Sequence, residues 1–406
     1  MKIKFCRSCT SKKIKEIFDF GKLAHAGVFP IEKNKNIKKE YLKVLYCENC
    51  SLVQLDRNYS LNYMFGKNYG YKSGTNEIMK NHLKNLVKKI QLDFNLERND
   101  KVLDIASNDG TLINYYDKNL IRCANDPLIN KFSKNYKHIK FKFSDFFSAE
   151  KILKKIKNFK VITALAVAYD LQKPNVFFKG IKKLLAKDGI LILEVADLYL
   201  TQKNNVFDTF CHEHLEYYSF KSINRILNKN GLKVFKHQFF DINGGTSRYF
   251  VCHLDNSKSI DKSVNQLENL ENRNKVNSIN SMKVFFRKVK ILKKKTNNLL
   301  KSIKRKSKII HGYGASTKGN VLLQYFNIND SIIDFIAERN KEKFNKFTPV
   351  SNIKIISEER SRRLKPDYYF VLPWHFKKGI LKREKKLLKK NIKFIFPLPT
   401  LHVCSK

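Results

Sequence analysis

A cluster of ionisable side chains lies between Phe207 and Ser219, where the sequence reads FDTFCHEHLEYYS. Its thirteen residues include two histidines, two glutamates, one cysteine and two adjacent tyrosines. Side chains of this kind are unfavourable to bury unless they perform chemistry. We therefore predict a general acid/base site in this stretch.

The stretch also invites comparison with a zinc-protease helix, HExxH, in which two histidines one helical turn apart bind the metal. His212 and Glu213 would open this pattern, but Glu216 stands where the second histidine is required. His214 lies only two residues from His212, so the two cannot share a helix face. The spacing excludes a zinc protease.

Four of the eight cysteines are spaced as metal ligands, in two CxxC pairs. Each CxxC turn presents two thiolates, and two turns complete a tetrahedral zinc site. Short strands at Ile3–Phe5 and Leu42–Tyr46 precede the turns, as in a zinc ribbon. A zinc with four thiolates would be structural, in place of a larger core. The predicted ligands are Cys6, Cys9, Cys47 and Cys50.

The stretch KVLDIASNDGTLIN, Lys101–Asn114, predicts a strand, a tight loop and the start of a helix at Thr111. Small loop residues let a ligand approach the backbone, and a helix N-terminus offers N–H groups. An acidic residue at the end of the next strand suits a ribose diol. The single glycine is unlike GxGxxG, so we predict S-adenosylmethionine (SAM) and not a nicotinamide cofactor. The predicted contacts are Asp104, Ala106, Ser107, Asn108, Asp109, Gly110, Asp126 and Pro127.

The segment Tyr63–His82 is rich in Tyr, Gly, Ser and Asn and turns into a helix near Asn76. It is either a polar surface loop or a lid that carries aromatic and hydroxyl groups into a site. In the second interpretation Tyr69 and Tyr71 are catalytic candidates, and Ser73 is a cofactor contact.

Strands and helices alternate through the middle of the chain, which predicts a parallel, doubly wound α/β sheet. An antiparallel pair, Gly231–His237 and Arg248–Leu254, would end this sheet as in SAM-dependent methyltransferases. The remaining expected elements are strands at Ile121–Asn125, Lys140–Phe143, Val161–Ala168 and Ile190–Val195, with a helix at Val176–Leu185.

A second α/β unit is expected from Ile309 onward, opening with IIHGYGASTKGN as strand, glycine loop and helix. Asn320 stands where an ATP-binding P-loop requires lysine, which argues against ATP. A backbone nest for another phosphate stays open. Pro373-Trp374-His375 would either line a pocket or merely pack. Further strands are expected at Ile332–Ala337, Tyr368–Leu372 and Phe394–Phe396.

The 406 residues allow two or three domains, and the formal charge is +45. The basic residues are mostly Lys, spread among Asn and Ile, so we attribute the charge to composition and expect no nucleic-acid partner. The basic run Lys283–Lys308 is interpreted as the solvated face of a linking helix, in preference to an RNA arm. With no apolar stretch long enough for a membrane span, we expect a cytoplasmic protein.

The motifs together resemble the nucleotide-sugar C-methyltransferases, which include the sugar 3-C-methyltransferases of branched deoxysugar pathways. The resemblance extends from Cys6 to Pro399, with the motifs in the family's order. It rests on the four cysteines, SNDGT, HEHLEYYS, NGG followed by an Arg, GYGASTKGN, AERNKEKF and PDYYFVLPWHF.

The resemblance implies methylation of a sugar carbon beside a 4-keto group. It implies a zinc domain (1–62), a SAM-binding domain (63–255), a helical linker (256–304) and a Rossmann-like domain (305–406) that helps to hold the nucleotide-linked sugar. Glu213 and His214 match the acid/base pair, with His214 as base and Glu213 orienting or charging it. Tyr71, or Tyr69, matches a site tyrosine. The implied substrate contacts are Asn243, Gly244, Arg248, Gly314, Ser316, Thr317, Lys318 and Asn320.

The chain departs from the family at three places. Cys211 replaces a tyrosine before HEH, Tyr169 stands where many relatives have a histidine, and Thr348–Ile353 replaces a glycine-rich segment. Two alternatives stay open: a nucleic-acid methyltransferase, which the charge and zinc ribbon favour, and a zinc-stabilised scaffold. Against the first, the chain lacks the Pro-Pro loop of many base-methylating enzymes. Against the second, a scaffold would give the HEH and SNDGT motifs no function.

Overall fold

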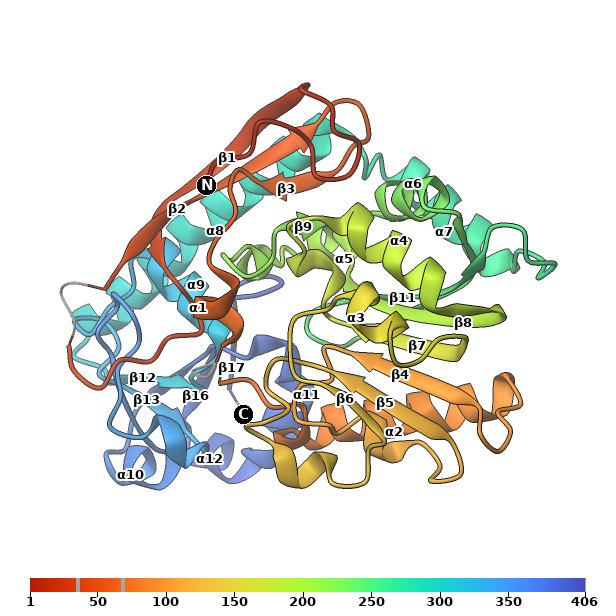
Figure 1. Cartoon of the computed structure of the whole chain (residues 1–406). Coiled ribbons are helices and arrows are strands. Elements are labelled where there is room, and N and C mark those ends of the chain that lie inside the picture. Colours follow the sequence, from red (N-terminus) through yellow and green to blue (C-terminus); the bar gives the residue numbers. More distant parts are fainter. Residues whose placement is uncertain (34–36, 67–69, 406) are drawn as a thin grey trace. The chain divides into compact units, whose positions relative to one another are not determined.

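The computed structural model describes residues 1–33, 37–66 and 70–405 and shows a mixed α/β protein (Figure 1). The chain forms two compact units, each assembled from separate segments. The first unit comprises Met1–Lys15, Tyr46–Leu198 and Leu215–Asn277; the second comprises Glu16–Leu45, Tyr199–His214 and Ser278–Lys406. The units do not follow the four ranges expected from the sequence motifs.

A seven-stranded sheet of order β10-β11-β8-β7-β4-β5-β6 forms the centre of the first unit. Its strands run parallel except β11, which is antiparallel to both β8 and β10. This is the predicted doubly wound sheet with its terminal hairpin. The strands are β4 (Lys101–Ile105), β5 (Ile121–Asn125), β6 (Phe141–Phe143), β7 (Phe159–Leu165), β8 (Leu185–Ala196), β10 (Leu232–Phe240) and β11 (Thr246–His253).

Apolar side chains cover both faces of this sheet, because its parallel strands are buried on both sides. α2 (Glu77–Asp93) packs Leu83, Leu86, Val87 and Ile90 onto one face, and Asn76 caps its N-terminus as predicted. The other face is covered chiefly by α4 (Pro174–Leu184) and α6 (Phe220–Lys229). The shorter helices α1 (Leu61–Phe65) and α3 (Ala149–Leu153), and α7 (Lys262–Arg273), complete the unit.

Two local predictions in the first unit are wrong. No α-helix begins at Thr111; only a 3-10 turn, Ile113–Tyr115, follows the loop, and the chain then turns away at Tyr116. Residues 3–5 form no strand, and only an isolated bridge joins Lys2 to Arg57. Alternating or apolar runs this short carry too little information to fix secondary structure.

The segment around the cysteine turns joins a short antiparallel pair in the first unit. β3 (Val53–Leu55) pairs with β9 (Glu216–Tyr217), so Gln54 lies opposite Glu216. Most of β1 (Ile14–Ala24) and β2 (Lys39–Cys47) belongs to the second unit. β2 contains the strand predicted at Leu42–Tyr46.

A six-stranded sheet of order β14-β13-β12-β15-β16-β17 forms the second unit, and only its last pair is antiparallel. Strand order reverses between β12 and β15, which is the position where open α/β sheets bind ligands. The strands are β12 (Ile310–Tyr313), β13 (Phe335–Glu338), β14 (Lys354–Ser357), β15 (Tyr368–Val371), β16 (Lys393–Phe396) and β17 (His402–Cys404). The helices are α5 (Leu198–Lys203), α9 (Thr317–Phe326), α10 (Glu358–Arg363), α11 (Lys377–Arg383) and α12 (Lys385–Lys389).

The basic run predicted as a linking helix forms most of α8 (Ile279–Arg305). The helix and its solvated face are confirmed. Its other side buries a stripe of mainly apolar residues: Met282, Phe285, Phe286, Val289, Leu292, Thr296, Leu300 and Ile303. Such a stripe at helical spacing packs against a core.

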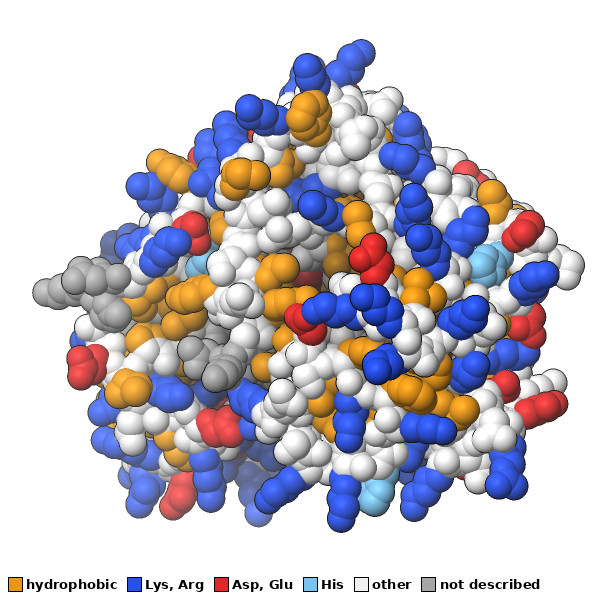
Figure 2. All heavy atoms as spheres, in the orientation of Figure 1, with side chains coloured by type: hydrophobic (Ala, Val, Ile, Leu, Met, Phe, Trp, Pro, Cys, Tyr) orange, Lys and Arg blue, Asp and Glu red, His pale blue; other side chains and the backbone are white. Residues whose placement is uncertain are grey.

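Basic side chains are scattered over the face drawn in Figure 2, among uncharged and hydrophobic ones. They gather into no single patch on that face. Among the residues that the structure describes, no helix is long and apolar enough to cross a membrane.

Candidate active site

The four predicted zinc ligands come together in the first unit. Their sulfur atoms all lie within 4.8 Å of one another, and the pairs Cys6–Cys50 and Cys9–Cys47 are each 3.5 Å apart. A tetrahedral site with Zn–S bonds of about 2.3 Å requires sulfurs about 3.8 Å apart. The cluster therefore fits a zinc ion, which the four thiolates would hold.

The loop after β4 turns sharply enough to expose its backbone. Ala106, Asn108 and Gly110 have φ values of 58°, 53° and 78°, in the left-handed region. Gly110 is required there, because a Cβ atom would also lie 3.1 Å from the ring of Tyr136. The Tyr136 hydroxyl secures the loop through Ser107 Oγ at 2.9 Å and the Asn108 carbonyl at 3.0 Å. The loop is thus a rigid cradle beside the sheet edge.

Three carboxylates surround this loop. Asp126, at the end of β5, accepts the Asn108 N–H at 2.9 Å, and burial raises the pKa of Asp126 to about 6. Burial also raises the pKa of Asp104, which accepts the Thr163 hydroxyl at 2.7 Å, to about 7. Asp109 accepts from Thr111 Oγ1 at 2.6 Å. An acidic rim without a phosphate cradle fits SAM, whose sulfonium and ammonium groups are cationic.

The segment interpreted as either a surface loop or a lid contacts the same loop. The Ser73 N–H donates to Asn108 Oδ1 at 3.0 Å, and the Gly74 N–H donates to Asp109 Oδ2 at 2.9 Å. The Tyr71 carbonyl accepts from Asn108 Nδ2 at 3.1 Å, while its side chain is 44% exposed. Tyr69 lies outside the described residues. Pro127 follows Asp126 and is half-buried.

The acid/base stretch begins in the second unit with a 3-10 turn, Phe207–Thr209. His214 Nδ1 lies 2.9 Å from the Thr209 carbonyl oxygen, which can only accept, so Nδ1 carries a hydrogen. In the neutral ring the lone pair is then on Nε2. Burial, and then the charge of Lys318, lower the pKa of His214 to about 3. The imidazole is therefore neutral at physiological pH, the form that a base requires.

A lysine of the same unit acts on this histidine, and a buried carboxylate in turn acts on the lysine. Asp208 is fully buried; its Oδ2 accepts the indole N–H of Trp374 at 2.8 Å, and its Oδ1 has no hydrogen-bond partner among the described residues. Burial raises the pKa of Asp208, and the Lys318 charge opposes this rise. Burial lowers the pKa of Lys318, against the charges of Asp208 and Cys211. Lys318 is thus a partly desolvated cation that opposes protonation of His214.

Two further members of the HEH motif take different positions. Glu213 has one carboxylate oxygen that is buried without a hydrogen-bond partner among the described residues. His212 is 1% exposed, stacks on His25 with ring centroids 4.5 Å apart, and contacts the Glu40 carbonyl at 3.2 Å. His212 is therefore held as a packing residue.

The predicted substrate contacts divide between the two units. In the first unit Arg248 is 2% exposed, donates to Glu194 at 2.6 Å, lies 3.2 Å from His82 and stacks over Phe240. A cavity of about 660 Å³ borders this group. Asn243 and Gly244, at φ 55° and 91°, form the turn before β11.

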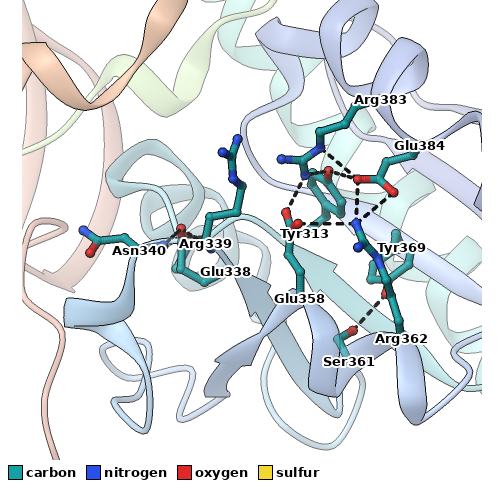
Figure 3. Close-up of polar contacts among 11 residues, drawn as sticks. Tyr313, Glu338, Arg339, Asn340, Glu358, Ser361, Arg362, Tyr369, Arg383 and Glu384 are labelled. Carbon is teal, nitrogen blue, oxygen red and sulfur yellow. Dashed lines mark hydrogen bonds and ion pairs between the residues drawn. The ribbon is translucent and has the colours of Figure 1, made fainter.

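In the second unit the glycine loop after β12 is already heavily hydrogen-bonded. Glu338, at the end of β13, accepts the Ala315 N–H at 2.7 Å and the N–H groups of Arg339 and Asn340 (Figure 3). Ser316 caps α9, and Thr317 is exposed. Asn320 donates a hydrogen bond to the Ala26 carbonyl. A Cβ atom on Gly314 would lie 2.8 Å from Pro373. A carboxylate on a loop N–H argues that this loop does not cradle a phosphate there.

Nearby in the second unit, Glu384 is 3% exposed and accepts from Arg362, Arg383 and the Tyr313 hydroxyl (Figure 3). This network braces the sheet. Three charged residues that the sequence did not single out thus prove to be hydrogen-bonded: Asp208 and Glu194, which are buried, and Glu338, which is half-buried. Only the position of Glu338, directly after a strand and following a glycine loop, could have indicated its role.

Comparisons with known proteins cover nearly the whole chain. Residues 6–65 match the profile of a zinc binding domain, residues 76–237 a methyltransferase domain, and residues 241–399 a C-methyltransferase C-terminal domain. The C-methyltransferase NovU of Streptomyces niveus is 25% identical over 414 residues, which cover 98% of this chain and 96% of NovU. The chain is a SAM-dependent C-methyltransferase.

Two solved methyltransferases match part of the chain at low similarity. A SAM-dependent methyltransferase of Clostridium acetobutylicum is 15% identical with a TM-score of 0.36 and covers 44% of this chain and 93% of its own. Magnesium protoporphyrin IX methyltransferase of Synechocystis, solved with bound S-adenosylhomocysteine (SAH), is 14% identical with a TM-score of 0.35; the match covers 46% of this chain and 90% of that one. SAM is the cofactor of the C-methyltransferase, and the cysteine cluster is its zinc site.

Proposed function

We propose that this C-methyltransferase methylates a carbon beside the ketone of a nucleotide-linked 4-keto deoxysugar. The observation that carries the proposal is the state of His214, whose Nδ1–H is held by the Thr209 carbonyl and whose ring is neutral. A neutral imidazole with a fixed ring is suited to removing a proton. The resemblance and NovU, a C-methyltransferase, support the same reaction type.

A ketone explains why a base is needed. A sugar carbon becomes nucleophilic only after a proton leaves it, and a neighbouring carbonyl shares the resulting charge as an enolate. His214 would remove this proton, with Glu213 orienting the ring, and such a base contributes roughly 10²–10⁴-fold to the rate. SAM supplies an electrophilic methyl group to which the carbon then bonds.

The enolate oxygen carries new negative charge that the chain must stabilise. Lys318, a desolvated cation whose charge already acts on His214, is suited to this task. A tyrosine hydroxyl, from Tyr71 or Tyr69, would also donate to the oxygen.

The cofactor residues would act by binding. Asp126 would accept the ribose hydroxyls, and the loop Ala106–Gly110 would contact the rest of SAM, with Asp104 behind it and Ser73 above. Substrate binding is proposed for Arg248 with Asn243 and Gly244, and for the first turn of α9 with its preceding loop. The Ala315 N–H already donates to Glu338, so in this loop the substrate would be bound by side chains more than by backbone N–H groups.

Labelled SAM offered with nucleotide-linked 4-keto deoxysugars or with total RNA tests the proposal. We expect label in the sugar at a non-exchangeable carbon position. Label in RNA alone would establish the nucleic-acid alternative that the +45 charge favours. Absence of label from both, with SAH still bound, would contradict the proposed substrate class.

A further inference from the structure

Glu216 belongs to the acid/base stretch and is buried in the first unit. It is 1% exposed; burial raises the pKa of its carboxyl, and the charge of Arg7 opposes this rise. Its charged neighbour is Arg7, whose Nε lies 3.7 Å from Glu216 Oε1. Because both side chains are almost fully buried, solvent screens this ion pair very little.

Arg7 is part of the zinc site, because it directly follows Cys6 in the first CxxC turn. Its guanidinium donates to the Leu55 carbonyl at 2.6 Å, and its backbone N–H donates to Gln54 Oε1 at 3.0 Å. Two further bonds, each 2.8 Å, reach the Arg57 carbonyl and Asn58 Oδ1. Arg7 therefore ties the cysteine turn to β3 and to the chain beyond it.

β3 in turn holds the residues that follow HEH. Gln54 lies opposite Glu216 in the β3–β9 pair, and the Leu55 N–H donates to the Leu215 carbonyl at 2.9 Å. The Leu215 N–H donates to the Tyr169 carbonyl at 2.6 Å. The residue bonded directly to His214 is thus fixed through both of its backbone polar groups.

Charge links this arrangement to the metal. A zinc ion with four thiolates has a net charge of about −2, so Arg7 would lie between the zinc cluster and Glu216. Burial acts against the charge of both Arg7 and Glu216 and each charge favours the other, so loss of the metal or of Glu216 would leave Arg7 without one of its buried charge partners. Breaking a buried pair on one side is strongly destabilising for the local arrangement.

We propose that Arg7 and Glu216 are positioning residues through which the zinc site holds the segment that begins at Leu215, the residue bonded directly to His214. The zinc ion is then required for turnover as well as for stability. The proposal rests on the proposed role of His214 for its catalytic consequence, but not for its structural one. It gives Glu216 a role in the HEH stretch that is not acid/base chemistry.

The test compares Glu216→Gln with Glu150→Gln, a matched change at an exposed residue of α3. Hydrogen exchange of the Leu215 and Leu55 amides is measured without substrate, together with zinc content and SAH affinity. We expect Glu216→Gln to keep one zinc and SAH affinity within twofold, and to speed exchange at both amides at least tenfold. Turnover at a temperature well below unfolding should fall at least tenfold, and Glu150→Gln should change nothing.

Chelation of zinc from the wild-type chain should speed exchange at the same two amides while exchange in the SAM loop stays unchanged. Unchanged exchange in both Glu216→Gln and the zinc-free chain would overturn the proposal. Faster exchange with full turnover would overturn its catalytic part. If the wild-type chain methylates no sugar offered, the proposed function fails, while the exchange measurements still decide the positioning role.

Discussion

Asp126→Asn tests the cofactor site most sharply, because this carboxyl has two defined roles in the free protein. Its Oδ2 accepts the Asn108 N–H at 2.9 Å, and its Oδ1 accepts the Leu128 N–H at 2.7 Å. Asparagine retains one acceptor oxygen and replaces the other with an NH₂ donor. The substitution therefore removes the negative charge and turns one loop contact from attractive to repulsive.

The expected loss of affinity follows from the hydrogen bonds to the ribose. A hydrogen bond to a charged group contributes about 1.5–3 kcal/mol. Loss of one such bond corresponds to about a 10- to 150-fold rise in the Kd for SAH at pH 7.5. Isothermal titration calorimetry with SAH measures this directly, without any substrate.

The pH dependence provides an independent check with a defined sign. Burial raises the pKa of Asp126 to about 6, so wild-type affinity for SAH should weaken as pH falls through 6. The free energy of unfolding should respond oppositely: a carboxyl whose folded pKa is raised stabilises the fold below that pKa and loses this contribution as pH rises. In Asp126→Asn the part of each dependence that is centred near pH 6 should be lost, while Asp104, whose pKa burial raises to about 7, still titrates.

The matched control is Asp145→Asn, since Asp145 is an acid that follows β6 and pairs with Lys151 at the surface. It should leave SAH affinity within twofold. If Asp126→Asn retains wild-type affinity at pH 7.5, or if its affinity still falls through pH 6, Asp126 does not contact the ribose.

Two further substitutions probe the charged group in the second unit. Lys318→Gln should raise the pKa of His214, because the lysine charge lowers it. NMR titration of the ring measures this pKa, and an unchanged value would contradict the electrostatic coupling. Turnover should also fall at least tenfold. Trp374→Phe removes the indole N–H that Asp208 Oδ2 accepts. The unpaired buried acceptor should lower the free energy of unfolding by about 1–3 kcal/mol in urea denaturation, and an unchanged midpoint and slope would show that the bond is not needed.

The sequence predicted those features that depend on local pattern. The strands Lys101–Ile105 and Ile121–Asn125 are placed by the alternation of strands, loops and helices along the chain, and CxxC pairs predict a four-sulfur cluster from spacing alone. The acid at the end of β5 lies beside the loop after β4, because neighbouring parallel strands end at the same sheet edge.

Features that depend on contacts between distant segments could not be predicted. The residues next to Asp208 in the sequence give no indication that it accepts a hydrogen bond from Trp374, 166 residues away. The solvated face of α8 was expected from its lysines, but the apolar stripe on the opposite side, which decides its packing, was not singled out. In place of the helix expected at Thr111 the chain forms a single 3-10 turn, because tertiary contacts decide the secondary structure of so short a segment.

The central claim, that His214 removes a carbon-bound proton, can be measured without methyl transfer. A nucleotide-linked 4-keto deoxysugar is incubated in D₂O with the enzyme and SAH, and exchange of the hydrogen beside the ketone is followed by NMR. We predict exchange with the wild-type chain and with His138→Asn, a control at an exposed histidine. His214→Asn should bind SAH normally and catalyse neither exchange nor methylation. Exchange at the wild-type rate in His214→Asn would contradict the account.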